Sequence, residues 1–377
     1  MGFGQVILAI LGVVVLMIVH ELGHMLAARR FGMRVETFSL GFGPTIWKHK
    51  PKDSPTTYQI AVVPFLAYVK IAGMNPFEPV DPKDKGSYAN ASLWARIVTI
   101  AAGPIANYLL AFVLFFVGTV MGGRLAPDEA SMRVEPHPDG PAAQVGILKG
   151  DRVLSINGSP IRDWDALKAT MAAHPGETVD VEVERNDKIL HFSPVVGSEG
   201  ERKGKIWVGP VSRVMGMGET TLVCLKLPPL MIYENVRALA MAITFREKPD
   251  VGGPVRMVKE VSNAIAIGPS AALRYLGAIS AGLVAINLLP IPALDGGRLM
   301  FLLYEAIARK RANEKVEAKI HAVALLMFLA LFVVITVHDL IPTKDKVEGS
   351  SKGAPAKSAP ALSASPPTPP PPTPTTP

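Results

Sequence analysis

The feature that most constrains this chain is a pair of histidines inside an apolar N-terminal segment. Residues 2–28 contain only four clearly polar side chains, and three of them lie in His20-Glu21-Leu22-Gly23-His24. On a helix, positions i and i+4 share a face, so His20 and His24 can bind one metal ion while Glu21 handles a proton beside it. A chance pair on a surface helix is the alternative, but such a helix would be amphipathic. Because ionisable groups inside a membrane are expensive, the pattern predicts a functional site at membrane depth.

Composition agrees with a membrane protein that also has soluble parts. Hydrophobic residues make up 49% of the chain, charged residues 19%, and the formal net charge is +7. No basic helix or aromatic-interleaved basic patch points to nucleic acid. Cys224 is the one cysteine, so no intramolecular disulfide can form, and a zinc site must use histidine and carboxylate ligands.

Four apolar segments predict four membrane spans, at about residues 4–28, 97–121, 275–294 and 322–337. The first is too long for a signal peptide and lacks basic residues before it. The third is interrupted by Pro290 and Pro292. Basic residues follow the first span and separate the third from the fourth, so the positive-inside rule puts both loops in the cytoplasm. The N-terminus, residues 122–274 and the C-terminus are then expected outside.

Two other apolar stretches are not predicted to span the membrane. Residues 58–73 are rich in β-formers around Pro64, and they predict either a cytoplasmic hairpin or a β-loop that dips toward the membrane. In the second case an edge strand beside the metal site could pair with an extended substrate. Residues 220–245 contain Pro228, Pro229 and several charges, which favours an interfacial or partly buried segment.

Residues 124–199 change to a β-rich pattern. The sequence around Gly146–Gly158 predicts a strand and an Asn-Gly turn, Asp163–Ala173 has helical spacing, and a hairpin is expected around Asn186-Asp187. The core motif resembles that of a bacterial PDZ domain, and is matched by Gly150, Asp151, Val153, Ile156, Asn157 and Gly158. PDZ domains hold peptide ends by strand addition. The alternative is a small β-rich module with a structural role, and the sequence identifies no peptide-binding residues.

A third ligand is expected at Asp295, in the segment Asn287–Gly297 that ends the third span. Two histidines and one carboxylate leave the fourth position of a tetrahedral zinc ion open for water, as catalytic sites require. The alternative is that Asp295 caps a helix starting near Arg298.

Taken together, these motifs resemble the site-2 protease family of intramembrane zinc metalloproteases, and are most similar to the bacterial regulator of sigma-E protease group. The resemblance covers about residues 1–340. It rests on His20–His24 with Ala28–Gly32, Phe38–Pro44, Ala101–Asn107, Gly252–Val255 and Asn287–Gly297. The chain departs from the pattern in having a single PDZ-like module and a Pro-rich tail.

The resemblance implies an α-helical polytopic membrane protein of about four transmembrane helices with one inserted β-rich PDZ-like domain. We expect a membrane core from residues 1–121 and 271–341, the PDZ-like domain at 124–199, an interfacial or extracytoplasmic connector at 200–270, and a disordered tail at 349–377. The expected location is the bacterial inner membrane, with the active site near the cytoplasmic side.

The resemblance also implies regulated intramembrane proteolysis. The expected substrates are single-pass membrane proteins already trimmed by another protease, of the anti-sigma factor or remnant signal peptide class. Zinc (Zn²⁺) would be held by His20, His24 and Asp295, with Glu21 as the general base and Asn287 steadying the oxyanion. The expected partners are these substrates, the lipid bilayer and a peptide C-terminus at the PDZ-like domain.

Two other classes of protein compete with this interpretation. A catalytically silent scaffold would bind peptides through the PDZ-like module, but it need not retain the base Glu21. A zinc or proton transporter would also place histidine and aspartate at membrane depth, but the sequence shows no internal inverted repeat.

Overall fold

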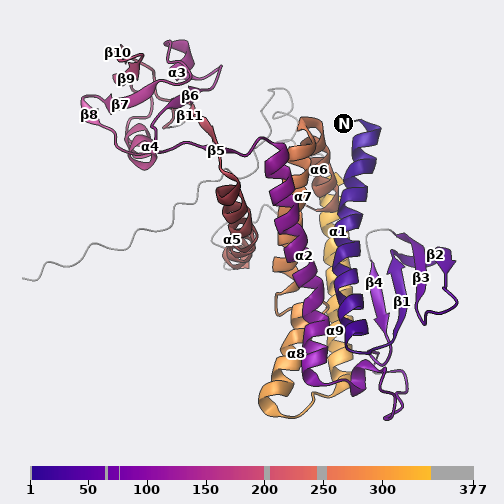
Figure 1. The fold of residues 1–377 in the computed structure, drawn as a ribbon. Helices are drawn as coiled ribbons and strands as arrows, with labels where there is room; N and C mark the ends of the chain where they lie inside the picture. Colours follow the sequence, from indigo (N-terminus) through magenta and orange to yellow (C-terminus); the bar gives the residue numbers. More distant parts are fainter. Residues whose placement is uncertain (1, 64–66, 76, 199–203, 244–252, 341–377) are drawn as a thin grey trace, which may run out of the picture. The chain divides into compact units, whose positions relative to one another are not determined.

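The computed structural model describes residues 2–63, 67–75, 77–198, 204–243 and 253–340 (Figure 1). Pro64, Gly252 and the tail at 349–377 lie outside this range. The chain divides into two compact units. The membrane unit is formed by residues up to Gly122 and from Met217 onward, and the β-rich unit by Gly123–Gly216. Residues 200–270, expected to be one connector, are therefore shared between the two units.

The membrane unit contains four helices long and apolar enough to cross a membrane, which confirms the four predicted spans. They are α1 (Phe3–Arg30), α2 (Leu93–Met121), α7 (Pro269–Asn287) and α9 (Glu314–Leu340). Helix α2 packs against both α1 and α7. The predicted end of the third span at Leu294 is wrong, because α7 stops at Asn287. Pro290 and Pro292 follow, and a residue before proline is disfavoured in helical conformation.

Three more helices complete the membrane unit: α5 (Met217–Ile243), α6 (Pro254–Ile267) and α8 (Asp295–Ala308). Helix α5 is not among the candidate spans. One side of it packs on α2 and α7, where Cys224 is fully buried and donates a thiol hydrogen bond to Thr119. This packing agrees with the partly buried segment predicted for residues 220–245.

A four-stranded sheet joins α1 to α2, in the order β2-β3-β1-β4. Its strands are β1 (Val35–Leu40), β2 (Phe42–His49), β3 (Thr57–Val63) and β4 (Tyr68–Ile71), and a short 3₁₀ helix, η1 (Tyr88–Asn90), follows. The hairpin considered for residues 58–73 is wrong, because β3 and β4 lie on either side of β1. Val35, Phe38 and Ile71 share a buried cluster with Met25 and Ala28, so the sheet packs on the C-terminal end of α1.

The β-rich unit has a sheet in the order β10-β9-β7-β8 around one buried cluster that includes Val153, Ile156 and Trp164. Its elements are β5 (Leu125–Pro127), β6 (Val134–Pro136), α3 (Pro141–Gln144), β7 (Arg152–Ile156), β8 (Ser159–Pro160), α4 (Trp164–Ala173), β9 (Val181–Arg185), β10 (Lys188–Phe192), β11 (Val208–Pro210) and β12 (Ser212–Val214).

Local signals in the β-rich unit predicted its elements well. The β9–β10 hairpin around Asn186-Asp187 is confirmed, with φ angles of 53° and 60° at the two turn residues. The predicted helix is confirmed as α4, whose N-cap Asp163 accepts a hydrogen bond from the backbone N–H of Ala166 at 2.7 Å. Strand β5 pairs with β12, so the chain enters and leaves this unit on neighbouring strands.

Candidate metal centre

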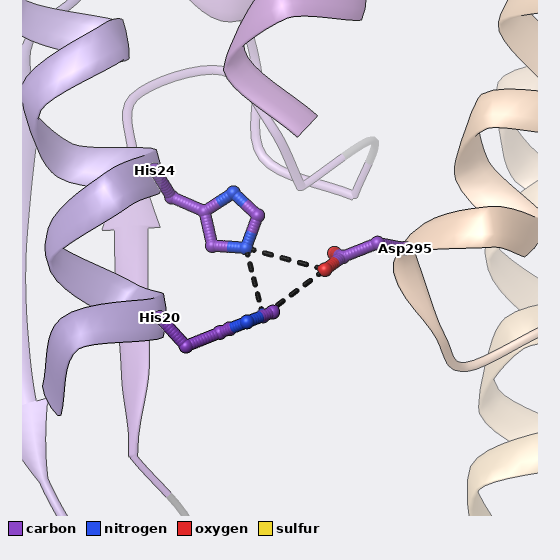
Figure 2. A group of neighbouring side chains, drawn as sticks. All are labelled: His20, His24 and Asp295. Atoms are coloured by element: carbon purple, nitrogen blue, oxygen red, sulfur yellow. Dashed lines mark hydrogen bonds and ion pairs between the residues drawn. The ribbon is translucent and has the colours of Figure 1, made fainter. Parts of the chain in front are cut away.

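Helix α1 supplies two imidazoles to the candidate site. His20 and His24 lie one turn apart, and their Nε2 atoms are 3.2 Å from each other. The two rings are nearly perpendicular, at 82°, so both Nε2 atoms point toward one spot rather than stacking side by side (Figure 2). Only 12% of the His20 side chain and 10% of the His24 side chain are exposed.

Asp295, on the first turn of α8, completes the group. Its Oδ2 atom lies 3.1 Å from His20 Nε2 and 3.3 Å from His24 Nε2 (Figure 2). The alternative role of Asp295 as a helix cap is wrong: α8 begins at Asp295 itself, its N-cap is Leu294, and no side chain makes a capping hydrogen bond there. The Asp295 carboxylate instead points toward the two histidines of α1.

These three residues fit zinc. The distances among their nearest donor atoms are 3.1, 3.2 and 3.3 Å. A tetrahedral zinc ion with ligands at ~2.0–2.1 Å separates its ligand atoms by about 3.3 Å. Two imidazoles and one carboxylate are also a donor set found in catalytic zinc sites, in which three protein ligands leave one position for water.

Helix α2 orients the two imidazoles through contacts to their Nδ1 atoms. The Nδ1 atom of His24 is 2.8 Å from the carbonyl oxygen of Thr99 and donates to it when Nε2 is a ligand. The Nδ1 atom of His20 lies 3.4 Å from the amide nitrogen of fully buried Asn107, whose amide oxygen has no partner among the described residues. A 180° turn of this amide would place the oxygen opposite His20 Nδ1–H, the arrangement that metal binding through Nε2 requires.

Small residues let α1 and α2 approach closely enough for these contacts. A Cβ atom added to Gly103 would lie 2.3 Å from His24 Nε2, and one added to Gly23 would lie 2.3 Å from the carbonyl oxygen of Ala102. Sequence reasoning used residues 101–107 only as a point of resemblance and missed Thr99 entirely. A backbone carbonyl acceptor leaves no signal in the sequence. Gly103 and Asn107 could be seen in the sequence, but nothing there indicated what they do.

The other two predicted site residues are placed differently. Glu21 is half-buried beside the group, within electrostatic range of both histidines, Asp295 and Arg298. Asn287 is the last residue of α7 and is also half-buried. Among the hydrogen bonds described for this chain, none joins the Asn287 side chain to the three grouped residues.

A cavity of about 710 Å³ lies beside the edge strand β4. Its lining combines β4 with residues of α2, α8 and α9, including Arg298 and His321, but not the three grouped side chains. Tyr88 also lines it, and burial raises the pKa of this phenol to about 12, so Tyr88 is neutral at physiological pH. The cavity therefore offers an edge strand together with both basic side chains and the carboxylates of Glu78, Glu305 and Glu317.

Comparison with known proteins gives a consistent result. The family model described as "Peptidase family M50" matches residues 8–331. A provisionally named zinc metalloprotease of Clostridium perfringens is 30% identical over 89% of this chain and 98% of its own length. A similarly named protein of Rhizobium meliloti is 30% identical over 86% of this chain and 93% of its own. The zinc metalloprotease RasP of Geobacillus kaustophilus is 26% identical over 85% and 94%.

Proposed function

Because this chain belongs to peptidase family M50, the site-2 protease family, we propose that it cuts single-pass membrane proteins that another protease has already trimmed. The chain is a multi-pass membrane zinc metalloendopeptidase, and its substrates are membrane proteins. Anti-sigma factors and remnant signal peptides are the proposed substrate classes.

The observation that carries the proposal is the convergence of His20, His24 and Asp295 at the helix that also bears Glu21. These three side chains would hold the metal, leaving Glu21 free. When bound, zinc makes water a nucleophile at neutral pH and polarises the peptide carbonyl. Glu21 takes the proton of the attacking water and then gives it to the leaving amine. Asn287 is proposed to steady the developing oxyanion or the substrate backbone.

The scissile peptide has to be extended before Glu21 and the attacking water can reach it, since helical carbonyls are hydrogen-bonded within their own helix. Strand β4 is one of the two edges of the sheet in the part of the chain that the structure describes, and the cavity lies along it. We therefore propose that an unwound substrate segment adds to β4 as a further strand, with the cavity receiving its side chains.

The proposed topology follows the basic residues. Helix α1 ends with Arg29 and Arg30, and the loop between α8 and α9 contains Arg309, Lys310 and Arg311. The C-terminal end of α1 and the α8–α9 loop are therefore assigned to the cytoplasm. His24 lies ~9 Å along the helix from Arg30, so water would reach the site from the cytoplasmic side. The β-rich unit would then lie outside the cell membrane as a PDZ-like module.

Purified protein in lipid vesicles tests the function against its competitors. The protein should bind zinc at one ion per chain and cut a model transmembrane peptide. A silent scaffold would bind peptide without cutting it, and a transporter would carry zinc or protons across the vesicle membrane. Stoichiometric zinc without cleavage of any trimmed transmembrane peptide would contradict the proposal.

A further inference from the structure

The segment between α7 and α8 contains a residue in an unfavourable backbone conformation. Ala293 has a φ angle of 81°, in the left-handed region that a residue with a Cβ atom rarely adopts. It lies two positions before Asp295, so its conformation sets the direction in which the chain delivers the Asp295 carboxylate. The turn is closed locally, because the backbone N–H of Leu294 donates to the carbonyl of Ile291 at 3.2 Å, and further support comes from outside the segment.

Helix α9 provides that support through one side chain. The backbone N–H of Ala293 donates a hydrogen bond of 2.8 Å to Nδ1 of His321. The His321 ring packs against Phe301 of α8, with 5.6 Å between ring centroids, and only 14% of the side chain is exposed. The ring is thus fixed between α9, which carries it, and α8.

The bonding state of His321 is defined by this contact. A backbone N–H can only donate, so Nδ1 accepts and the ring proton lies on Nε2. Nε2 is buried without a hydrogen-bond partner among the described residues, and the Glu317 carboxylate is 3.9 Å away. His321 lies where the charged first turns of α9 give way to its apolar part, and a buried histidine satisfied at one nitrogen only is costly unless the retained bond has a use.

We propose that His321 is a positioning residue of the metal centre. By accepting the Ala293 N–H it holds the left-handed bend, and the bend holds Asp295 against His20 and His24. Helix α9 is thereby linked to the metal ligands although it supplies none of them. The proposal rests on the ligand role assigned to Asp295 in the proposed function.

Two substitutions separate the hydrogen bond from the volume of the ring. His321→Phe keeps a ring but removes the acceptor, whereas His321→Asn retains an acceptor atom at the δ position. Val323→Phe, at a 58% exposed position of the same helix, is the control for a bulky change in α9. Hydrogen–deuterium exchange of residues 288–297 is measured in the zinc-free protein, and zinc loss to a chelator and cleavage kinetics in the loaded protein.

His321→Phe should speed exchange of residues 288–297 and accelerate zinc loss about tenfold, the scale of one lost hydrogen bond. It should lower kcat with little change in KM. His321→Asn should recover most of both losses, and Val323→Phe should match the wild type.

Unchanged exchange and zinc loss in His321→Phe would overturn the proposal, as would a His321→Asn protein as impaired as His321→Phe. Faster exchange with wild-type zinc loss would keep the contact between α9 and the loop but refute Asp295 as a ligand. That outcome would be a failure of the metal-site assignment rather than of the contact.

Discussion

At the scale of single residues, Glu21 differs from His20 and His24 because it lies outside the group of candidate metal ligands. His20, His24 and Asp295 share one point, and Glu21 stands beside them. We therefore expect Glu21→Gln to retain zinc while cleavage falls ~10²–10⁴-fold, as for loss of a general base. Zinc content and cleavage of a transmembrane peptide are measured on the same sample, with His20→Ala as the variant that should lose zinc. Near-normal turnover by Glu21→Gln would refute the mechanism.

Gly103 tests whether the spacing of α1 and α2 sets the metal site. Because its added Cβ atom would lie 2.3 Å from His24 Nε2, Gly103→Ala should displace this ring and weaken zinc binding by at least tenfold. Gly282→Ala is the matched control, since an added Cβ at Gly282 on α7 meets no atom within 4 Å. Zinc affinity is compared by competition with a chelator. Equal affinity in the two variants would show that the helices separate without disturbing His24.

At the scale of elements, a salt bridge holds α8 against α2. The Arg96 guanidinium donates two hydrogen bonds to Glu305, at 2.5 and 2.9 Å, and only 7% and 16% of these side chains are exposed. Arg96→Met should lower the free energy of unfolding by about 2 kcal/mol, less than the ~3–5 kcal/mol of a fully orphaned buried charge, since Arg311 stays 3.3 Å from Glu305. Thermal unfolding in detergent measures this.

The exposed pair between Lys149 and Glu135 is the control for that measurement. Glu135→Gln should change stability by less than ~1 kcal/mol, because solvent screens exposed charges. Equal effects of the two substitutions would mean that the bridge from α2 to α8 contributes no more than a surface pair.

Elements defined by local pattern could be predicted from the sequence, and elements defined by distant pairing could not. The apolar runs gave the four spans, and Asn186-Asp187 gave the β9–β10 hairpin. The parallel pairing of β1 with β3 depends on contacts between segments separated in the chain, so the pattern of residues 58–73 left both a hairpin and a β-loop open. The site followed the same division: the ligand types were visible, but the acceptors at Thr99 and His321 depend on how helices pack.

At the scale of the whole molecule, the basic residues make a prediction about sidedness. In spheroplasts, added protease should digest residues 124–199 and spare the 29–92 segment, because the positive-inside rule assigns the latter to the cytoplasm. Fragments are identified by mass spectrometry, and permeabilised cells serve as the control in which both segments are cut. Protection of residues 124–199 with digestion of 29–92 would invert the proposed topology.

The β-rich unit is the expected source of selectivity, because every substrate presents the same peptide bond to Glu21. If this unit excludes bulky outer domains, joining Gly123 directly to Gly216 should leave zinc binding intact and allow cleavage of full-length substrate. Cleavage of intact and trimmed substrates is compared for the deletion and the parent chain. An unchanged ratio of the two rates would show that selectivity comes from the sheet beside β4 or from the substrate helix itself.

The pairing of β5 with β12 has a consequence for how this architecture can diversify. The backbone N–H of Met215 donates to the carbonyl of Arg124 at 2.8 Å, so the two points where the β-rich unit joins the membrane unit are adjacent. A segment whose ends meet can be exchanged, duplicated or lost at the level of the gene without stretching its host. A ligand-binding domain inserted at the same junction would place cleavage of a membrane substrate under the control of a small molecule.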